Sequence, residues 1–228
     1  MSQFIIGFTG KIGVGKTTVS TMLCQILNSF GYRAGLASFG DGLRMSVARN
    51  LHIPIGVVYD QTLKGKPLEV IPGYEEFMPY IEGCSATAHL TPKSLLREVL
   101  QEYSQNGARL RDPDVWVNVL HERLELLPHE IIIIDDIRQK NELEYCKERG
   151  VVFRITPYKE YEDHPASNHP VESAIDNEVA GINLLEIDKF GFEYTSRAAQ
   201  RVASYLMNFF KEQEFETVFQ RLHHEGEK

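Results

Sequence analysis

The stretch "GKIGVGKTT", from Gly10 to Thr18, lies just behind the apolar run "FIIGF" near the start of the chain. It satisfies the pattern G-x-x-x-x-G-K-[ST] in full, between a predicted strand, Gln3 to Phe8, and a predicted helix that stops at Gly31. Glycines in such a loop let consecutive backbone N–H groups turn toward a phosphate, and the helix N-terminus adds a partial positive charge. The motif therefore predicts a phosphate-binding loop, or P-loop, between a strand and a helix.

Two side chains at the end of this loop complete the expected nucleotide site. Lys16 is expected to reach between the β- and γ-phosphates of ATP, and the Thr17 hydroxyl is expected to hold Mg²⁺. ATP and Mg²⁺ are therefore the predicted cofactors. The residues expected to bind the nucleotide are Gly10, Lys11, Gly13, Gly15, Lys16, Thr17 and Thr18.

Strands alternate with helices along most of the chain. The clearest strand is "EIIIIDD" (130–136), which is apolar on both faces as a central parallel strand should be. Because such alternation implies a parallel sheet covered on both sides, we predict a three-layer α/β/α P-loop fold with a mainly parallel sheet. Further strands are predicted at 34–39, 151–156 and 182–187, and helices from Thr91 (N-cap) and Pro92, from Asp112 and Pro113, around 141–148, and through Ala198 to Phe210.

Residues 52–90 interrupt this regularity. Four prolines and several glycines in that segment predict an irregular insertion. We therefore expect a single domain over residues 1–228 that carries one insertion.

Composition limits the functions that the chain could have. A net charge of −8 and a pI near 5.5 argue against a surface that neutralises many phosphates, so bulk nucleic acid is not an expected partner. No apolar run approaches the roughly 20 residues that span a membrane, so a membrane partner is not expected either. Cys24, Cys84 and Cys146 are widely spaced without a CxxC pair, which favours a reducing cytoplasm. The charged tail after Lys211 leaves a homodimer open.

Two acidic residues, Asp135 and Asp136, come directly after the strand in "IIIIDDIRQ". A sheet delivers such side chains to the crevice at its carboxyl end, so either one could support Mg²⁺. Arg138 is a candidate to stabilise the charge of a transferring phosphoryl group, with a surface ion pair to Glu142 as the alternative. The chain lacks an N-K-x-D guanine-reading tetrapeptide, which argues against a GTPase.

Several motifs together resemble the deoxynucleoside monophosphate kinases of tailed bacteriophages, which belong to the P-loop nucleoside monophosphate kinase group. The resemblance covers most of residues 3–175, and it would place the protein in the host cytoplasm. It implies transfer of the γ-phosphoryl group of ATP to a deoxynucleoside 5′-monophosphate (dNMP), a small-molecule partner, for phage-type DNA synthesis. The motifs are "GKIGVGKTT", "SFGDGLR", "TPKSLLREVLQ", "RDPDVWVN", "IIIIDDIRQKNE" and "HPVES".

The resemblance also implies roles for individual residues. Arg44 and Arg97 would hold the 5′-phosphate of the acceptor, Gln101 would lie near its base, and Asp41 would contact the sugar or the phosphate. Segment 52–90 would be the acceptor-side insertion, and 157–172 would be a lid-like loop that contains His169 and Glu172. The implied catalytic residues are Lys16, Asp136, Arg138 and Arg154, and the implied substrate-binding residues are Asp41, Arg44, Arg97, Gln101, Arg109, Trp116 and Glu172, with Arg111 a further phosphate candidate.

Other functions stay open on the residues alone. An alcohol acceptor, such as a nucleoside or a hydroxymethylated base, would need a carboxylate as general base, and Asp41 or Asp136 would serve. A phosphorylated acceptor that is not a nucleotide, or a nucleotide-binding module without transfer activity, would also carry a P-loop.

Overall fold

The structure is a computed structural model that describes residues 3–156, 175, 178, 180–187 and 191–225, with side chains up to residue 211. The chain packs as two compact units. We call Met1–Leu36 together with Pro128–Lys228 the sheet unit, and Ala37–Leu127 the helical unit. The helical unit is thus a continuous segment that extends beyond the predicted insertion at 52–90 on both sides.

The sheet unit is built on five strands in the order β2-β3-β1-β4-β5. The central strand β1 pairs in parallel with β3 and β4, and β4 pairs in parallel with β5. The mainly parallel sheet predicted from the sequence is confirmed. The strands are β1 (Phe4–Thr9), β2 (Ala34–Ala37), β3 (Ile131–Ile134), β4 (Gly150–Thr156) and β5 (Ile182–Glu186).

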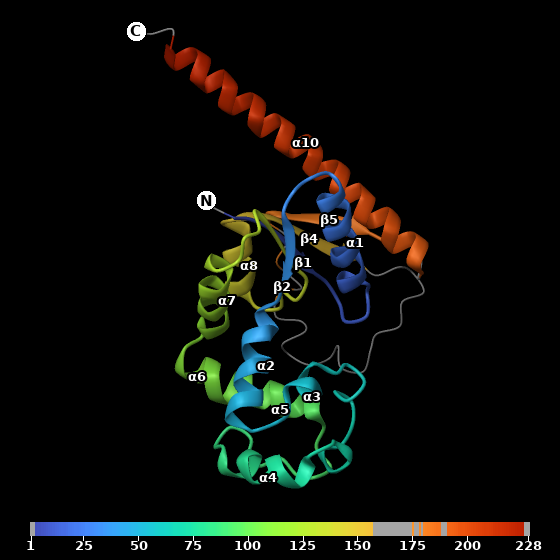
Figure 1. Ribbon diagram of the computed structural model, residues 1–228, viewed down its shortest axis with the longest axis vertical. Helices are drawn as coiled ribbons and strands as arrows, with labels where there is room; N and C mark the ends of the chain where they lie inside the picture. Colours follow the sequence, from blue (N-terminus) through green and yellow to red (C-terminus); the bar gives the residue numbers. More distant parts are fainter. Residues whose placement is uncertain (1–2, 157–174, 176–177, 179, 188–190, 226–228) are drawn as a thin grey trace. The chain divides into compact units, whose positions relative to one another are not determined.

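Helices cover both faces of this sheet. On one face, Ile6 and Phe8 of β1 share a buried cluster with apolar residues of α1 (Lys16–Ser29) and α10 (Phe192–Glu225), which lie side by side in Figure 1. Since alternate strand residues point to opposite faces, Gly7 faces the other side, where Cys146 of α8 (Lys140–Lys147) packs close to it. Both faces of β1 are therefore buried, which confirms the three-layer α/β/α fold.

The helical unit has its own apolar core. Side chains of several short helices meet there, including Leu51, Phe77, Ile81 and Leu96, each at most 1% exposed. The elements are α2 (Phe39–Asn50), α3 (Ile55–Tyr59), the 3-10 turn η1 (Leu68–Val70), α4 (Tyr74–Gly83), α5 (Leu96–Glu102), the π-helical turn η2 (Tyr103–Ala108), α6 (Arg109–Arg111) and α7 (Val115–Glu125).

Segment 52–90 is more regular than its prolines suggest, because it contains α3, η1 and α4. Pro54 occupies the N-cap of α3, where its missing N–H costs no helical hydrogen bond. Pro79 lies inside α4 on the exposed side, while Phe77, Met78 and Ile81 are buried. Burial of this apolar stripe outweighs the local preference of the prolines.

Two predicted helix starts are wrong. Thr91 does not cap a helix; its N–H donates to Ser94 Oγ in a turn, and α5 begins only at Leu96, where Glu98 accepts from the Leu95 N–H. Likewise Asp112 accepts from the N–H of Asp114, two residues on, so that α7 begins at Val115. Side-chain oxygens that could cap a helix form local turns in both places.

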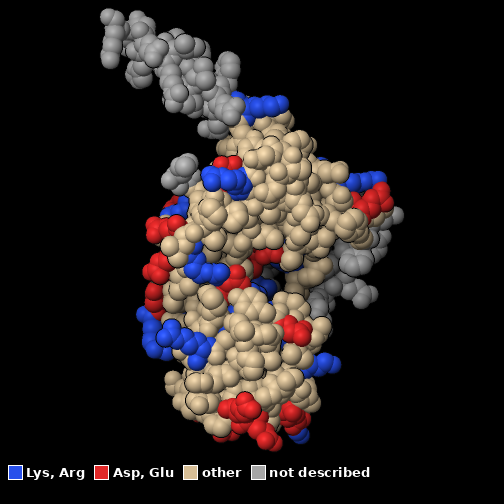
Figure 2. Space-filling view, in the orientation of Figure 1, with Lys and Arg blue, Asp and Glu red and all other residues tan. Residues whose placement is uncertain are grey.

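Acidic side chains gather over α4 in Figure 2, where Glu75, Glu76 and Glu82 are exposed. Among the described helices, none combines the length and the apolar character needed to cross a membrane.

Candidate active site

The P-loop leaves the carboxyl end of β1 and depends on two glycines. Gly10 has φ +137°, and a Cβ there would lie 2.5 Å from the carbonyl oxygen of Ile155. Gly15, the N-cap of α1, adopts the left-handed conformation with φ +98°. Any other residue would be strained at both positions, which explains why the motif has glycine there.

The side chain of Lys16 turns back toward the P-loop that precedes it. Its Nζ donates to the carbonyl oxygens of Gly10 at 2.7 Å and Lys11 at 2.8 Å. Burial and the nearby Arg138 guanidinium lower the pKa of Lys16 to about 8, although Asp135 and Asp136 act in the opposite direction. The folded chain thus holds an ammonium group that is poorly solvated and close to both aspartates.

This lowered pKa predicts that ATP binding depends on pH. Phosphate oxygens beside Lys16 would favour its charged form, so the complex should take up a proton above pH 8, and the affinity for ATP should fall by up to about tenfold per pH unit. Calorimetry between pH 7 and 9.5, in two buffers with different ionisation heats, measures both effects. The Lys16→Arg variant, which stays charged, should lose this dependence. If the dissociation constant of the parent for ATP did not change between pH 7 and 9.5, the prediction would be wrong.

The Thr17 hydroxyl and Asp135 form a pair of oxygen ligands suited to Mg²⁺. Asp135 follows β3, which lies beside β1, and its carboxylate accepts a hydrogen bond from the Thr17 side chain. Burial raises the pKa of Asp135, and the Thr17 hydrogen bond opposes this shift. Mg²⁺ in nucleotide sites is held by one or two protein oxygens together with phosphates and water. The residues present therefore fit the cation, and the contact with Thr17 favours Asp135 over Asp136 as its ligand.

Arg138 lies close enough to Lys16 to affect its pKa. The carboxylate of Glu142, its alternative ion-pair partner, accepts hydrogen bonds from the backbone N–H groups of Arg138 and Gln139 at 2.8 and 3.0 Å. Glu142 is buried, and its carboxylate gives two backbone N–H groups at the start of α8 a hydrogen-bond acceptor. Glu142 thus fixes the backbone that carries Arg138.

Arg154 lies on β4 opposite Thr9, next to the strand that leads into the P-loop. It is half-buried, and its guanidinium donates to the carbonyl oxygen of Ile175. The lid-like loop predicted at 157–172, with His169 and Glu172, lies outside the described residues.

In the helical unit, Asp41 and Arg44 lie in a half-buried charged cluster. Asp41, in the first turn of α2, contacts Arg44 Nη1 at 3.0 Å and Arg123 Nη1 at 3.6 Å. The hydroxyl of Tyr59 forms a hydrogen bond with Asp41, and the Arg44 guanidinium lies over the Tyr59 ring at 5.3 Å. The sequence did not indicate Tyr59 or Arg123, because nothing local shows that α3 and α7 meet α2.

The other acceptor-side candidates differ in their exposure. Arg97 and Gln101 are both half-buried and lie about one helical turn apart on α5. Trp116 is only 3% exposed, and its indole N–H donates to Ser104 Oγ at 2.8 Å. Trp116 is thus packed inside the helical unit, and its contact with substrate stays a prediction. Arg109 donates to the carbonyl oxygen of Pro113, and Arg111 to that of Gly107.

Comparison with known proteins finds similar backbones among small-molecule kinases. No family model matches the chain, and no curated protein sequence matches it. Shikimate kinase from Bacteroides thetaiotaomicron is 13% identical with a TM-score of 0.46, and the match covers 90% of this chain and 98% of that one. Gluconokinase from Sinorhizobium meliloti 1021 is 13% identical (TM-score 0.42; 93% and 97% covered), and shikimate kinase from Acinetobacter baumannii in complex with shikimate is 17% identical (0.43; 91% and 94%). These similarities concern the path of the chain and not the choice of acceptor.

Proposed function

We propose that the protein is an ATP-dependent kinase that transfers the γ-phosphoryl group to the 5′-phosphate of a dNMP, giving the dNDP and ADP. The proposal of phosphoryl transfer rests on one observation. Thr17 is hydrogen-bonded to Asp135 beside Lys16, at the carboxyl ends of two adjacent parallel strands. This arrangement combines an ammonium group, a metal-binding pair of oxygens and a loop of backbone N–H groups. Each of these recognises part of a triphosphate with its metal ion.

The chain's own residues would act by positioning and by neutralising charge. The P-loop amides and Lys16 would hold the β- and γ-phosphates, and Arg138 and Arg154 would supply further positive charge to the transferring group. Thr17 and Asp135 would hold Mg²⁺, which would supply positive charge that offsets the negative charge of the phosphates. Because the acceptor phosphate is already ionised near neutral pH, the reaction needs no general base.

The helical unit favours a phosphate acceptor over an alcohol. An alcohol would need Asp41 or Asp136 as base, yet Asp41 is engaged by two arginines and by Tyr59. A substrate hydroxyl would have to displace these groups before it could reach the carboxylate oxygens of Asp41. The choice of a dNMP among phosphorylated acceptors is supported by the resemblance of the motifs to the phage enzymes.

The proposal is tested by coupled measurement of ADP release with ATP and a panel of acceptors. The panel contains ribo- and deoxynucleoside monophosphates, modified pyrimidine nucleotides, unphosphorylated nucleosides and hydroxymethylated bases. Turnover that depends on dNMPs supports the proposal. Turnover with the unphosphorylated compounds alone would show an alcohol kinase, and ATP binding without turnover would show a nucleotide-binding module.

The Arg97→Ala variant should raise the KM for the acceptor by about 10- to 100-fold and leave kcat nearly unchanged. The reason is that a lost charge-assisted hydrogen bond weakens binding of the phosphate by about this factor. Steady-state kinetics at saturating ATP measures both constants. Arg49→Ala is the matched control, because Arg49 is an exposed arginine of the same unit, at the end of α2. An acceptor KM equal to that of the parent would refute the role of Arg97.

A further inference from the structure

Three helices of the helical unit bring together what we call the Asp41 cluster: Asp41, Arg44, Tyr59 and Arg123. The two carboxylate oxygens of Asp41 face different guanidiniums, Oδ1 toward Arg44 at 3.0 Å and Oδ2 toward Arg123 at 3.6 Å. The cluster thus contains two permanent positive charges and a single carboxylate. Its charge is one positive unit in excess, and this excess suits an anionic ligand.

Arg123 carries the clearest sign of a missing partner. Its Nη1 is shielded from solvent, yet it has no hydrogen-bond acceptor among the described residues. The separation of 3.6 Å from Asp41 Oδ2 is too long for a hydrogen bond. A buried donor without an acceptor destabilises a fold, so such groups are uncommon unless something else binds them. A ligand oxygen would satisfy this donor.

The cluster is accessible and its arginines are preorganised. The side chains of Arg44 and Asp41 are 20% and 22% exposed, and that of Arg123 is 39% exposed, so a ligand could reach the guanidiniums without unfolding the unit. The Tyr59 ring supports the guanidinium of Arg44, which restricts its orientation. Partial burial also strengthens the attraction between an arginine and an anion, because water screens it less.

We propose that Arg123 binds the 5′-phosphate of the acceptor together with Arg44, and that Asp41 is the positioning residue that attracts both guanidiniums and holds them in place. This inference rests on the proposed function, because it identifies the phosphate as that of the acceptor nucleotide. A purely structural cluster would only tie α7 to α2. The two roles differ in a measurable way, because only a ligand-binding role changes the KM for the acceptor.

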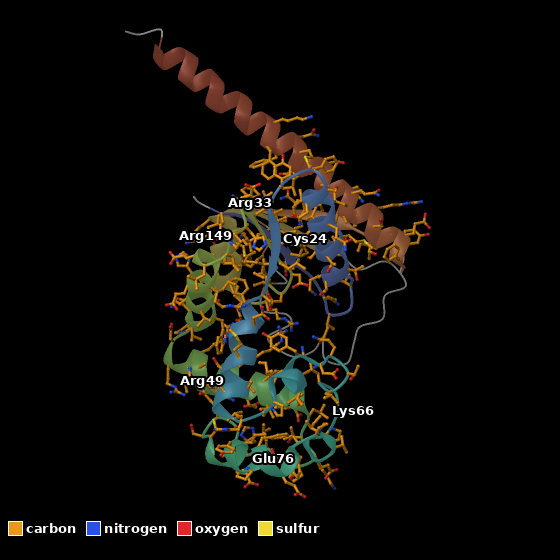
Figure 3. All side chains as sticks on the ribbon, viewed as in Figure 1. Cys24, Arg33, Arg49, Lys66, Glu76 and Arg149 are labelled. Atoms are coloured by element: carbon orange, nitrogen blue, oxygen red, sulfur yellow. The ribbon has the colours of Figure 1, made fainter. Side chains whose placement is uncertain are left out.

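Kinetics of matched variants test this role. Arg123→Gln should raise the KM for the dNMP about 10- to 100-fold, with the KM for ATP within about twofold of the parent, as expected for one lost charge-assisted contact. Arg123→Lys should recover part of the loss, because it keeps the charge without the fork of donors. Arg49→Gln, which removes the exposed arginine labelled in Figure 3, should match the parent. A lower melting temperature with an unchanged acceptor KM in both Arg123 variants would overturn the proposal.

Asp41→Asn tests the positioning role. It removes the charge that holds both arginines but leaves both in place, so the acceptor KM should rise. The effect should not add to that of Arg123→Gln in the double variant, because residues in one network act together. Fully additive effects would contradict the role of Asp41.

A binding measurement separates this inference from the proposed function. The measurement uses the Lys16→Ala variant, in which the P-loop should bind phosphate less tightly. Inorganic phosphate is titrated at constant ionic strength, and the arginine side-chain Nε–H signals are followed by NMR. The Arg123 signal should shift on titration, and Arg123→Gln should weaken phosphate binding at least about tenfold. If dNMPs prove not to be acceptors but this result holds, the proposed function fails and the anion site stands. If phosphate binds equally with and without Arg123, the site itself fails.

Discussion

Replacing Lys16 by alanine will lower kcat by about 10³-fold or more, and the protein will remain folded. The loss is large because one preorganised donor to the transferring group is worth about 10²–10³ in rate, and Lys16 also binds the triphosphate in the ground state. The fold tolerates the change, because the hydrogen bonds that Lys16 Nζ donates within the described part of the chain go to two carbonyl oxygens of its own loop. Burial also disfavours its charge, as its pKa of about 8 shows, so removing it relieves a desolvation penalty.

Kinetics of ADP release and a thermal unfolding curve measure these two effects. Lys93→Ala serves as the control, since Lys93 is exposed and lies in the turn before α5. Its activity and melting temperature should equal those of the parent. An active Lys16→Ala protein would mean that the loop holds no transferring phosphate, and the proposed function would then fail.

The Asp135→Asn variant should lower kcat by at least about 10²-fold and should raise the Mg²⁺ concentration needed for half-maximal rate. The reason is that Asp135 is the carboxylate paired with Thr17, and Mg²⁺ held there would supply charge that stabilises the transition state. Asparagine keeps the shape of the side chain and removes its charge. Because burial already raises the pKa of Asp135, the stability of the fold should fall little.

Comparison with Asp136→Asn makes this test specific. The two aspartates are adjacent in sequence, so both variants remove the same charge from the same end of β3. We expect the Mg²⁺ dependence of Asp136→Asn to stay close to that of the parent. A larger Mg²⁺ effect in Asp136→Asn would reverse the assignment of the metal ligand.

Local signals account for the parts of the fold that the sequence predicted. The order of the residues in the P-loop motif and the apolar runs of β1 and β3 act over a few neighbouring positions, so they can be read along the chain. The predicted helix starts at Thr91 and Asp112 are wrong because side-chain oxygens form local turns there: Ser94 Oγ accepts from the Thr91 N–H, and Asp112 accepts from the Asp114 N–H. The helices in 52–90 were missed because their stability comes from burial in a shared core and not from local preference.

The sequence by itself determined the P-loop, the parallel sheet and the presence of two acidic residues after β3. The P-loop and the acidic pair follow from the spacing of residues along one loop and one strand, and the parallel sheet follows from the alternation of strands and helices along the chain. The tertiary structure alone decided that Thr17 pairs with Asp135, that Trp116 is buried against Ser104, and that Arg123 approaches Asp41. Each of these contacts joins two different elements, and those of Thr17 with Asp135 and of Arg123 with Asp41 join segments far apart in the chain. Which side chains meet in this way depends on how helices and strands pack, and no local pattern encodes it.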